Sequence, residues 1–467
     1  MILIVILFPG PFYLHAQGNI AKPENLGPAI NTECDELMPV ISPDGKTLYF
    51  CRGECAGNFG AQDIYYSELQ PNGSWSKAVN IGEPLNNKWN NFVCAVTPDG
   101  NTLLLGNEYR QDGNIGRGIS LTDKISGGWT FPKKVNIDNY YNLDEFSSFY
   151  LANDGKTLLM SIKRTDSYGK KDIYVSFLQD NGEYSEPINL GETINTIGDE
   201  ISPFLASDEV SLYFSSTGHG GYGNTDVFFS RRLDKTWKKW SEPINLGPTI
   251  NGPGWDAYLK ITASGEYAYF VSTKDSYGKG DIFRIKLPDI VKPLPVLLVY
   301  GKVIDAKTRM PIAAIITYEI IPIKKEAGIA HSDPTNGDYK IILPVGENYV
   351  FCARADGYYS SKDTMDLRVL SRYTELERDI ELIPTEDSIF CFRNILFNSG
   401  KATLKQESFI EVDKVYRFLV GNPELDIEID AHTDSVGSAE MNMDLSERRA
   451  KTIYDYLIDK GIPAIRM

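Results

Sequence analysis

The sequence contains few of the residues that most enzymes and nucleic-acid-binding proteins use at their sites. It has no G-x-S-x-G nucleophile elbow. Basic residues are outnumbered, with 47 Lys and Arg against 63 Asp and Glu and a formal net charge of −16. Proteins that bind duplex nucleic acids neutralise phosphates with Lys and Arg, so we expect no nucleic-acid partner. Only four histidines occur in 467 residues: His15, His219, His331 and His432.

Long apolar runs are also scarce. The N-terminal run, MILIVILFPGPFYLHAQG, is too short and too interrupted by proline to span a membrane. It resembles a secretory signal over residues 1–16, with cleavage expected after Ala16; a buried first strand is the alternative. No cysteine lies near the cleavage point, so we expect no lipid anchor. These features predict an exported protein without a transmembrane span.

Cysteine is infrequent, and its placement leaves the pairing open. Export permits disulfides, and four cysteines in the first part of the chain allow a local bridge, although spacing alone does not determine connectivity. Metal binding by Cys51 and Cys55 is not expected, because no Cys–His cluster completes a tetrahedral set. The six cysteines are Cys34, Cys51, Cys55, Cys94, Cys352 and Cys391.

A turn followed by an apolar strand recurs along nearly 300 residues. SPDGKTLYF (42–50) is echoed by TPDGNTLLL (97–105), ANDGKTLLM (152–160), ASDEVSLYF (206–214) and TASGEYAYF (262–270), a period of 54 to 56 residues. Each period offers four strand-like runs separated by turn residues. Four short strands per period predict the blades of a β-propeller.

The fifth unit has no fourth strand of its own, but a copy of that strand, PENLGPAIN, occupies residues 23–31. We therefore predict a five-bladed propeller over residues 17–288 in which the N-terminal strand completes the last blade. Closure of this kind removes exposed strand edges. The units resemble the WD40-like repeats of bacterial envelope proteins of the TolB type, a resemblance that implies the fold more than the function.

An aspartate begins the third strand of four units, which raises the question of acid–base or metal chemistry. A carboxylate repeated at one position of a blade more often accepts hydrogen bonds from the backbone of a turn, and we favour that interpretation. With no nucleophile–His pair evident, we predict that the protein is not an enzyme and needs no cofactor. The residues concerned are Asp63, Asp172, Asp226 and Asp281.

A proline-stiffened linker is predicted at residues 289–296. Strands with period-2 alternation then follow, separated by Asn-Gly, Pro and Asp-Gly turns. The segments GKVIDAKTRMPI and NGDYKIILPVGENY resemble the carboxypeptidase regulatory-like domain. That resemblance implies a small transthyretin-like β-sandwich over residues 297–384, acting as a non-catalytic spacer.

The last segment carries the most specific chemistry. LDIEID (425–430) alternates like a strand, HTDSVG (432–437) is a predicted strand-to-loop junction, and Ser446 is the expected N-cap of a helix that ends at Gly461. In this arrangement Arg449 falls in the first helical turn, near Asp434. An acid and an arginine facing one cleft suit a zwitterion, since arginine can bind a carboxylate bidentately.

HTDSVG, Asn442 and LSERRA match the OmpA-like peptidoglycan-binding domain in order and spacing. The resemblance implies that Asp434 and Arg449 bind the diaminopimelate of the peptidoglycan peptide stem, with Thr433 in the site and Asn442 a supporting loop residue. The domain is expected over residues 385–467 as a C-terminally truncated α/β fold. The family continues past GIPAIRM with a strand region bearing an Asn-Arg-Arg motif, whose absence predicts an incomplete sheet.

Together these segments predict a multidomain, mainly β, non-catalytic scaffold in the periplasm, associated with the outer membrane and cell wall. It would anchor an envelope or secretion complex to peptidoglycan and bind envelope proteins through the propeller. The domain order resembles the peptidoglycan-binding subunit of the type IX secretion system. The alternative is an envelope protein whose propeller binds or senses a glycan or peptide.

Overall fold

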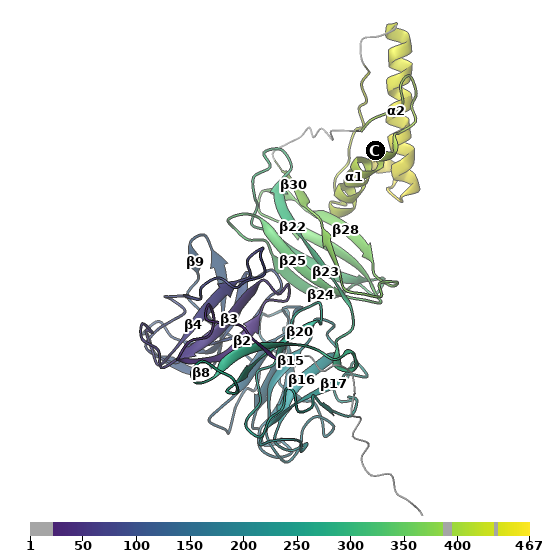
Figure 1. Cartoon of the computed structure of the whole chain (residues 1–467). Coiled ribbons are helices and arrows are strands. Elements are labelled where there is room, and N and C mark those ends of the chain that lie inside the picture. The colour runs from purple at the N-terminus through teal and green to yellow at the C-terminus, as the bar shows by residue number, and fades with distance from the viewer. Residues whose placement is uncertain (1–21, 386–394, 434–437) are drawn as a thin grey trace, which may run out of the picture.

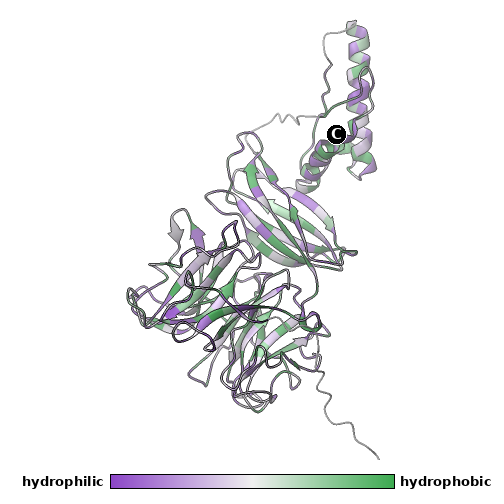
Figure 2. Cartoon of the chain, viewed as in Figure 1, coloured by the Kyte–Doolittle hydropathy of each residue, from purple (hydrophilic) through white to green (hydrophobic). Residues whose placement is uncertain are grey.

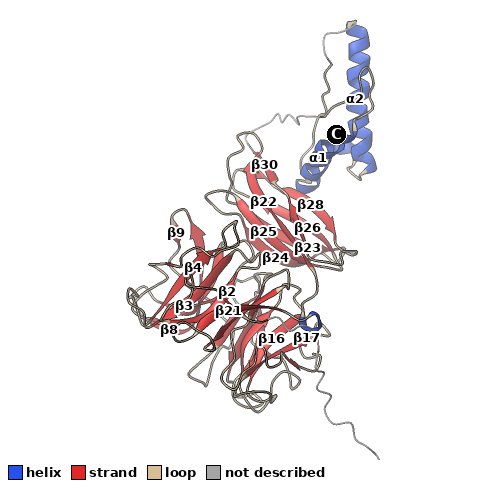
Figure 3. Cartoon of the chain, in the orientation of Figure 1, coloured by secondary structure: helices blue, strands red, loops and turns tan. Residues whose placement is uncertain are grey.

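The computed structural model describes residues 22–385, 395–433 and 438–467. Antiparallel sheets dominate the first two parts of the chain, and helices appear near the C-terminus (Figures 1 and 3). Within the described residues, no helix combines the length and the apolar character needed to cross a membrane. We call residues 22–288 the repeat region, 296–384 the middle region and 395–467 the C-terminal region.

The repeat region contains five antiparallel sheets in the part of the chain that is described, one for each expected unit. The first is built from β2 (Asp35–Ile41), β3 (Thr47–Gly53), β4 (Gln62–Glu68) and β5 (Val79–Asn80). The second contains β6 (Val93–Val96), β7 (Thr102–Tyr109), β8 (Ile115–Ile125), β9 (Gly128–Trp129) and β10 (Lys133–Lys134). The third contains β11 (Ser148–Leu151), β12 (Thr157–Ile162), β13 (Asp172–Phe177) and β14 (Ile188–Asn189).

The fourth sheet contains β15 (Glu200–Leu205), β16 (Ser211–Ser216), β17 (Asp226–Arg231) and β18 (Ile244–Asn245). The fifth joins the two ends of the region, with β1 (Glu24–Asn25) beside β21 (Asp281–Lys286), β20 (Tyr267–Ser272) and β19 (Lys260–Ile261). The N-terminal segment thus supplies the outer strand of the last sheet, paired in the register Glu24↔Arg284.

The third-strand aspartates hold the loops that precede them. Asp63 accepts hydrogen bonds from the backbone N–H groups of Phe59 and Gly60 at 2.7 and 3.1 Å. Asp172, Asp226 and Asp281 accept the same bond from the residue four positions earlier. The interpretation of these carboxylates as turn acceptors is confirmed, because each accepts at least one backbone N–H from the loop before it. Burial raises the pKa of Asp172 to about 6.

Apolar strand residues of neighbouring sheets pack together and form the interior of the repeat region. Figure 2 shows the green apolar stretches concentrated along the strands. Leu158, Leu159 and Met160 on β12 are fully buried, as are Ile173 and Val175 on β13. Because both faces of these strands are covered, their sequences are continuously apolar rather than alternating.

A disulfide joins Cys34 to Cys55 across a sequence separation of 21 residues. Cys51, Cys94 and Cys352 are buried free thiols, and Cys391 lies outside the described residues. The bridge is local to the first unit, within the set of pairings that the sequence left open.

Replacing Cys34 and Cys55 together by serine is expected to lower the free energy of unfolding by about 3 kcal/mol, because the bridge restricts the unfolded chain. Urea unfolding of the oxidised protein and the double variant measures the difference. Dithiothreitol should destabilise the unsubstituted protein by a similar amount and leave the double variant unchanged. Equal stability of all samples would contradict the prediction.

The middle region forms two sheets around one apolar core. One contains β22 (Val296–Asp305), β25 (Asp338–Pro344), β27 (Tyr358–Tyr359), β29 (Thr374–Glu377) and β30 (Ile380–Pro384). The other contains β23 (Ile315–Ile321), β24 (Lys325–His331), β26 (Asn348–Arg354) and β28 (Ser361–Asp366). A short 3₁₀ helix, η1 (Asp289–Val291), precedes them.

The middle region rests on the Asp-Gly turns of the repeat region. Lys340 forms an ion pair with Asp44 at 2.6 Å, Lys124 forms one with Asp333 at 2.8 Å, and Asp99 accepts a hydrogen bond from the backbone of His331 at 2.7 Å. The turns therefore do more than connect strands. They form the surface that carries the next domain, which lies directly above the repeat region in Figure 1.

The C-terminal region consists of η2 (Gln406–Ser408), α1 (Phe409–Gly421), α2 (Ala439–Asp459) and η3 (Ala464–Arg466). Val412, Val415 and Leu419 on α1 pack with Ile453 and Leu457 on α2. The end of α1 contacts the middle region beside β28.

Ser360 and Asn422 exchange hydrogen bonds across this junction. The Ser360 N–H donates to Asn422 Oδ1 at 3.1 Å, and Asn422 Nδ2 donates to the Ser360 carbonyl at 2.7 Å. A Cβ added at Gly421 would lie 2.7 Å from the Ser360 carbonyl oxygen, so only glycine allows this close approach.

Candidate functional site

The candidate site predicted from the sequence lies at the start of α2. Asp434 is outside the described residues, and Thr433 is the last described residue before it. Asn442 and Arg449 both lie on α2, seven residues apart. Since seven residues complete about two helical turns, the two side chains leave the same face of the helix.

The helix begins earlier than the sequence predicted. Its N-cap is Ser438, whose hydroxyl accepts a hydrogen bond from the backbone of Met441 at 3.2 Å. Ser446 instead lies within the helix and donates to the Met443 carbonyl at 2.8 Å. The predicted N-cap was wrong because Ala439, Glu440 and the following residues favour helix, so the earlier serine caps it.

This earlier start changes the position of two predicted site residues. Asn442 belongs to the first turn of α2, where its N–H donates to the Ser438 carbonyl at 3.0 Å, and is not a loop residue. Arg449 lies about three turns into the helix and not in its first turn. Backbone N–H groups at the helix start therefore cannot assist Arg449 in binding a carboxylate.

Arg449 is oriented by the segment that precedes α1. Its guanidinium carbon lies 5.0 Å from the centre of the Phe397 ring, and its Nε donates to the Lys401 carbonyl at 3.2 Å. Thr452, one turn later, donates to the Ala402 carbonyl at 2.9 Å. The remaining guanidinium N–H groups form no hydrogen bond or ion pair within the described residues, and this leaves them available to an anionic ligand.

The strand predicted over residues 425–430 is not formed. Residues 425–433 belong to no strand and pair with none in the described part of the chain. The segment is instead tied to the C-terminal end: the Ile427 N–H donates to the Arg466 carbonyl at 2.9 Å, and Arg466 Nε donates to the Leu425 carbonyl at 2.9 Å. An alternating pattern gives a strand only where a partner strand accepts its hydrogen bonds.

A second repeated feature was not recognised from the sequence. An aromatic residue followed by glycine precedes each third-strand aspartate by four residues: Phe59, Tyr168, Tyr222 and Tyr277. All four rings are exposed, and the glycines that follow lie against the backbone of the next unit. The signal was the aromatic–glycine pair four and three residues before the aspartate, in the same register in each of these units.

Neither metal chemistry nor a histidine base is suggested by the described residues. No group of three or more His, Cys, Asp or Glu side chains within them could hold a metal ion. His219 packs against the rings of Phe214 and Phe228, at 5.7 and 5.2 Å between ring centres, and bonds the Ile194 carbonyl at 2.9 Å. This half-buried histidine packs against aromatic rings of the fourth sheet.

Comparison with known proteins shows that one part of this chain matches a protein family. Residues 396–467 match the OmpA family. Outer membrane protein A of Escherichia fergusonii is 45% identical over 73 residues, covering 15% of this chain and 30% of that protein. The protein of the same name from Klebsiella pneumoniae is 27% identical over 270 residues, covering 57% of this chain and 68% of that protein. The C-terminal region is therefore OmpA-like.

The chain spans between 21% and 30% of the length of the first curated relatives it matches. Among solved structures, α-L-arabinofuranosidase from Lactobacillus brevis is similar at 13% identity and a TM-score of 0.34, covering 57% of this chain and 94% of that one. GH43B of the Bacteroides ovatus xyloglucan locus has 12% identity and a TM-score of 0.38, covering 76% and 91%. TM-scores this low define neither a shared fold nor a shared activity.

Proposed function

We propose that the C-terminal region anchors the protein to peptidoglycan. The observation that carries this proposal is the OmpA family match over residues 396–467 together with the oriented guanidinium of Arg449. Stacking on Phe397 and the bond to the Lys401 carbonyl restrict the arginine without neutralising it. A restricted, uncompensated guanidinium suits the carboxylate of a diaminopimelate side chain.

Asp434 would complete the recognition by binding the ammonium group of the same side chain. Thr433 and Asn442 would line the site beside it. The shared helix face of Asn442 and Arg449 supports a ligand that lies along α2. This arrangement replaces the one expected from the sequence, in which the ligand met the first turn of the helix.

The rest of the chain would act as a non-catalytic scaffold of the cell envelope. We take the five sheets of the repeat region to be the blades of a propeller and the two sheets of the middle region to be a β-sandwich. The propeller would bind envelope or secretion proteins, and the sandwich would hold it at a distance from the wall. Exposed aromatic rings on the loops of the repeat region support a binding role for it.

Co-sedimentation with purified sacculi that contain diaminopimelate tests the anchor. The unsubstituted protein should pellet with the sacculi, and Arg449→Ala and Asp434→Ala should each lower its affinity at least tenfold, about 1.4 kcal/mol. Arg448→Ala is the matched control, because Arg448 is the neighbouring arginine and pairs with Asp444 on the exposed helix surface. It should pellet normally.

Two results would refute the anchor. One is an unsubstituted protein that stays in the supernatant. The other is equal retention of the protein and all three variants, which would show that attachment does not use Asp434 or Arg449. Circular dichroism of each variant establishes that α1 and α2 remain folded.

A further inference from the structure

The two ends of the sheets in the repeat region have different surroundings. The Asp-Gly turns at one end are covered by the middle region through contacts such as Lys340–Asp44. The second strand of each sheet runs away from its turn, so the loop that follows this strand lies at the opposite end. Side chains at that end remain exposed, among them Phe59, Tyr168 and Tyr222. A ligand that reaches the repeat region would meet this end.

A cavity of about 110 Å³ opens there between the second and third sheets. Its apolar walls include Phe92, Tyr140 and Phe149, and its polar lining includes Asn107, Arg117 and Glu145. This space is several times the roughly 10–15 Å³ that a cavity needs to hold one water. The cavity is therefore large enough for one ring-sized polar group, with apolar and polar surfaces both within reach.

The two charged side chains of the cavity do not neutralise each other. No ion pair joins Arg117 to Glu145 in the described part of the chain, although both line this space. The protein contact of Arg117 is a long bond to the Asp144 carbonyl, at 3.5 Å. Arg117 comes from β8 and Glu145 from the segment before β11, so a donor and an acceptor that do not pair with each other line one cavity and could both bond to a ligand.

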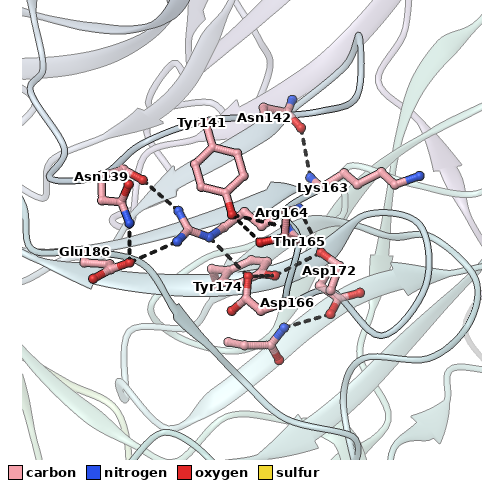
Figure 4. Close-up of polar contacts among 12 residues, drawn as sticks. Asn139, Tyr141, Asn142, Lys163, Arg164, Thr165, Asp166, Asp172, Tyr174 and Glu186 are labelled. Atoms are coloured by element: carbon pink, nitrogen blue, oxygen red, sulfur yellow. Dashed lines mark hydrogen bonds and ion pairs between the residues drawn. The ribbon is translucent and has the colours of Figure 1, made fainter.

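The wall of the cavity that belongs to the third unit is supported by residues that follow β12, Lys163 and Arg164. Figure 4 shows Arg164 close to Asn139 and Tyr141, at the start of the segment that lines the cavity, with its Nη1 donating to the Asn139 carbonyl at 2.8 Å. The Lys163 N–H donates to Asn142 Oδ1, also at 2.8 Å. The Arg164 side chain is 5% exposed and pairs with Glu186 at 3.1 Å. The three bonds of this buried arginine, to Asn139, Asp166 and Glu186, hold the start of the segment that lines the cavity.

The opposite wall depends on a glycine and on an unusual backbone conformation. A Cβ at Gly106 would lie 2.0 Å from the Phe92 ring, so that the ring can lie over this strand only because residue 106 is glycine. Asn107 has a φ of +74°, and its side chain donates to the Asn90 carbonyl at 2.9 Å. Left-handed non-glycine residues cost free energy and are concentrated at ligand-binding positions.

We propose that this cavity binds one pyranose unit of a polysaccharide. The C–H face of a pyranose packs against aromatic rings, here Phe92 and Phe149, while its hydroxyl groups need both donors and acceptors, here Arg117 and Glu145. A charged ligand fits less well, because the two opposite charges leave the lining without a net sign. Exposed rings beside the cavity, including Trp89 and Phe146, would carry the neighbouring units of the chain.

The proposal is independent of the anchor on α2, since it uses none of the same residues. Isothermal titration calorimetry of the full chain with β-1,4-linked N-acetylglucosamine, xylose and glucose oligomers tests it. At least one oligomer should bind with micromolar to millimolar affinity, and Arg117→Gln and Glu145→Gln should each weaken that binding at least tenfold. Both side chains are exposed, so the variants should fold.

Arg110→Gln is the matched control, because Arg110 lies on the same hairpin but pairs with Glu108 at 3.1 Å. It should bind like the unsubstituted protein, and so should Arg449→Ala, which impairs only the anchor. The proposal is overturned if no oligomer binds at millimolar concentration, if binding survives both cavity variants, or if a free amino acid or dipeptide binds in the cavity instead of the sugars.

Discussion

Replacing Glu36 by alanine is expected to lower the free energy of unfolding by about 3–5 kcal/mol, since it leaves a buried arginine without its counter-charge. Arg52 Nε lies 2.7 Å from Glu36 Oε1, and the two side chains are 10% and 0% exposed. Glu36 also accepts two bonds from Thr32, from its N–H at 2.9 Å and its hydroxyl at 2.6 Å. One substitution therefore removes three acceptor contacts from the first sheet.

The matched control is Glu54→Ala. Glu54 follows β3 of the first sheet and pairs with Lys279 of the fifth unit, but the side chains are 75% and 55% exposed, so its loss should leave the free energy of unfolding almost unchanged. Replacing both members of the buried pair, as Glu36→Leu with Arg52→Met, should restore much of the stability. Urea unfolding measures all four proteins, and similar losses for Glu36→Ala and Glu54→Ala would contradict the prediction.

Replacing Asn31 by alanine should cost about 2–6 kcal/mol, because two buried backbone groups lose their partners at about 1–3 kcal/mol each. Asn31 Nδ2 donates to the Ile282 carbonyl, and its Oδ1 accepts from the Ile282 N–H, both at 2.9 Å. These bonds hold the N-terminal segment against β21. The variant should therefore release β1 as well as lose stability.

Asn195 provides the comparison. It makes the same pair of bonds to the backbone of Ile173, but within the third unit and not at the N-terminal segment. Asn195→Ala should lose similar stability without exposing the N-terminus. Limited proteolysis with a glutamate-specific protease, which can cut after Glu24 of β1, followed by mass spectrometry, separates the two variants, and urea unfolding gives the free energies of unfolding. Resistance of Asn31→Ala to this cleavage would show that β1 does not depend on Asn31.

The repeat could be predicted from the sequence because its determinants are local. Gly45, Gly100 and Gly155 have φ values of +73°, +76° and +69°, the left-handed turn conformation that an Asp-Gly pair indicates. The turns recur in register, so each unit could be aligned with the next. Asp63 and its equivalents likewise bond to residues only three or four positions away.

The candidate site was harder to predict, since its geometry depends on partners that are distant in sequence. Whether residues 425–430 form a strand depends on which segment lies beside them. In the structure that neighbour is Arg466, which is not part of a strand. The position of Arg449 depends on which of two serines caps the helix, and both are good caps. The cavity between the second and third sheets combines residues of β7, β8 and β11 with residues from the segments before β6 and β11, and no single motif marks it.

The two fastened junctions have a mechanical consequence. Ion pairs tie the Asp-Gly turns to the middle region, and the Ser360–Asn422 bonds tie the middle region to α1. A pull on the exposed end of the sheets would pass through these contacts to α1 as well as along the backbone. The chain is thus suited to transmit tension and to keep a fixed spacing between whatever its two ends hold.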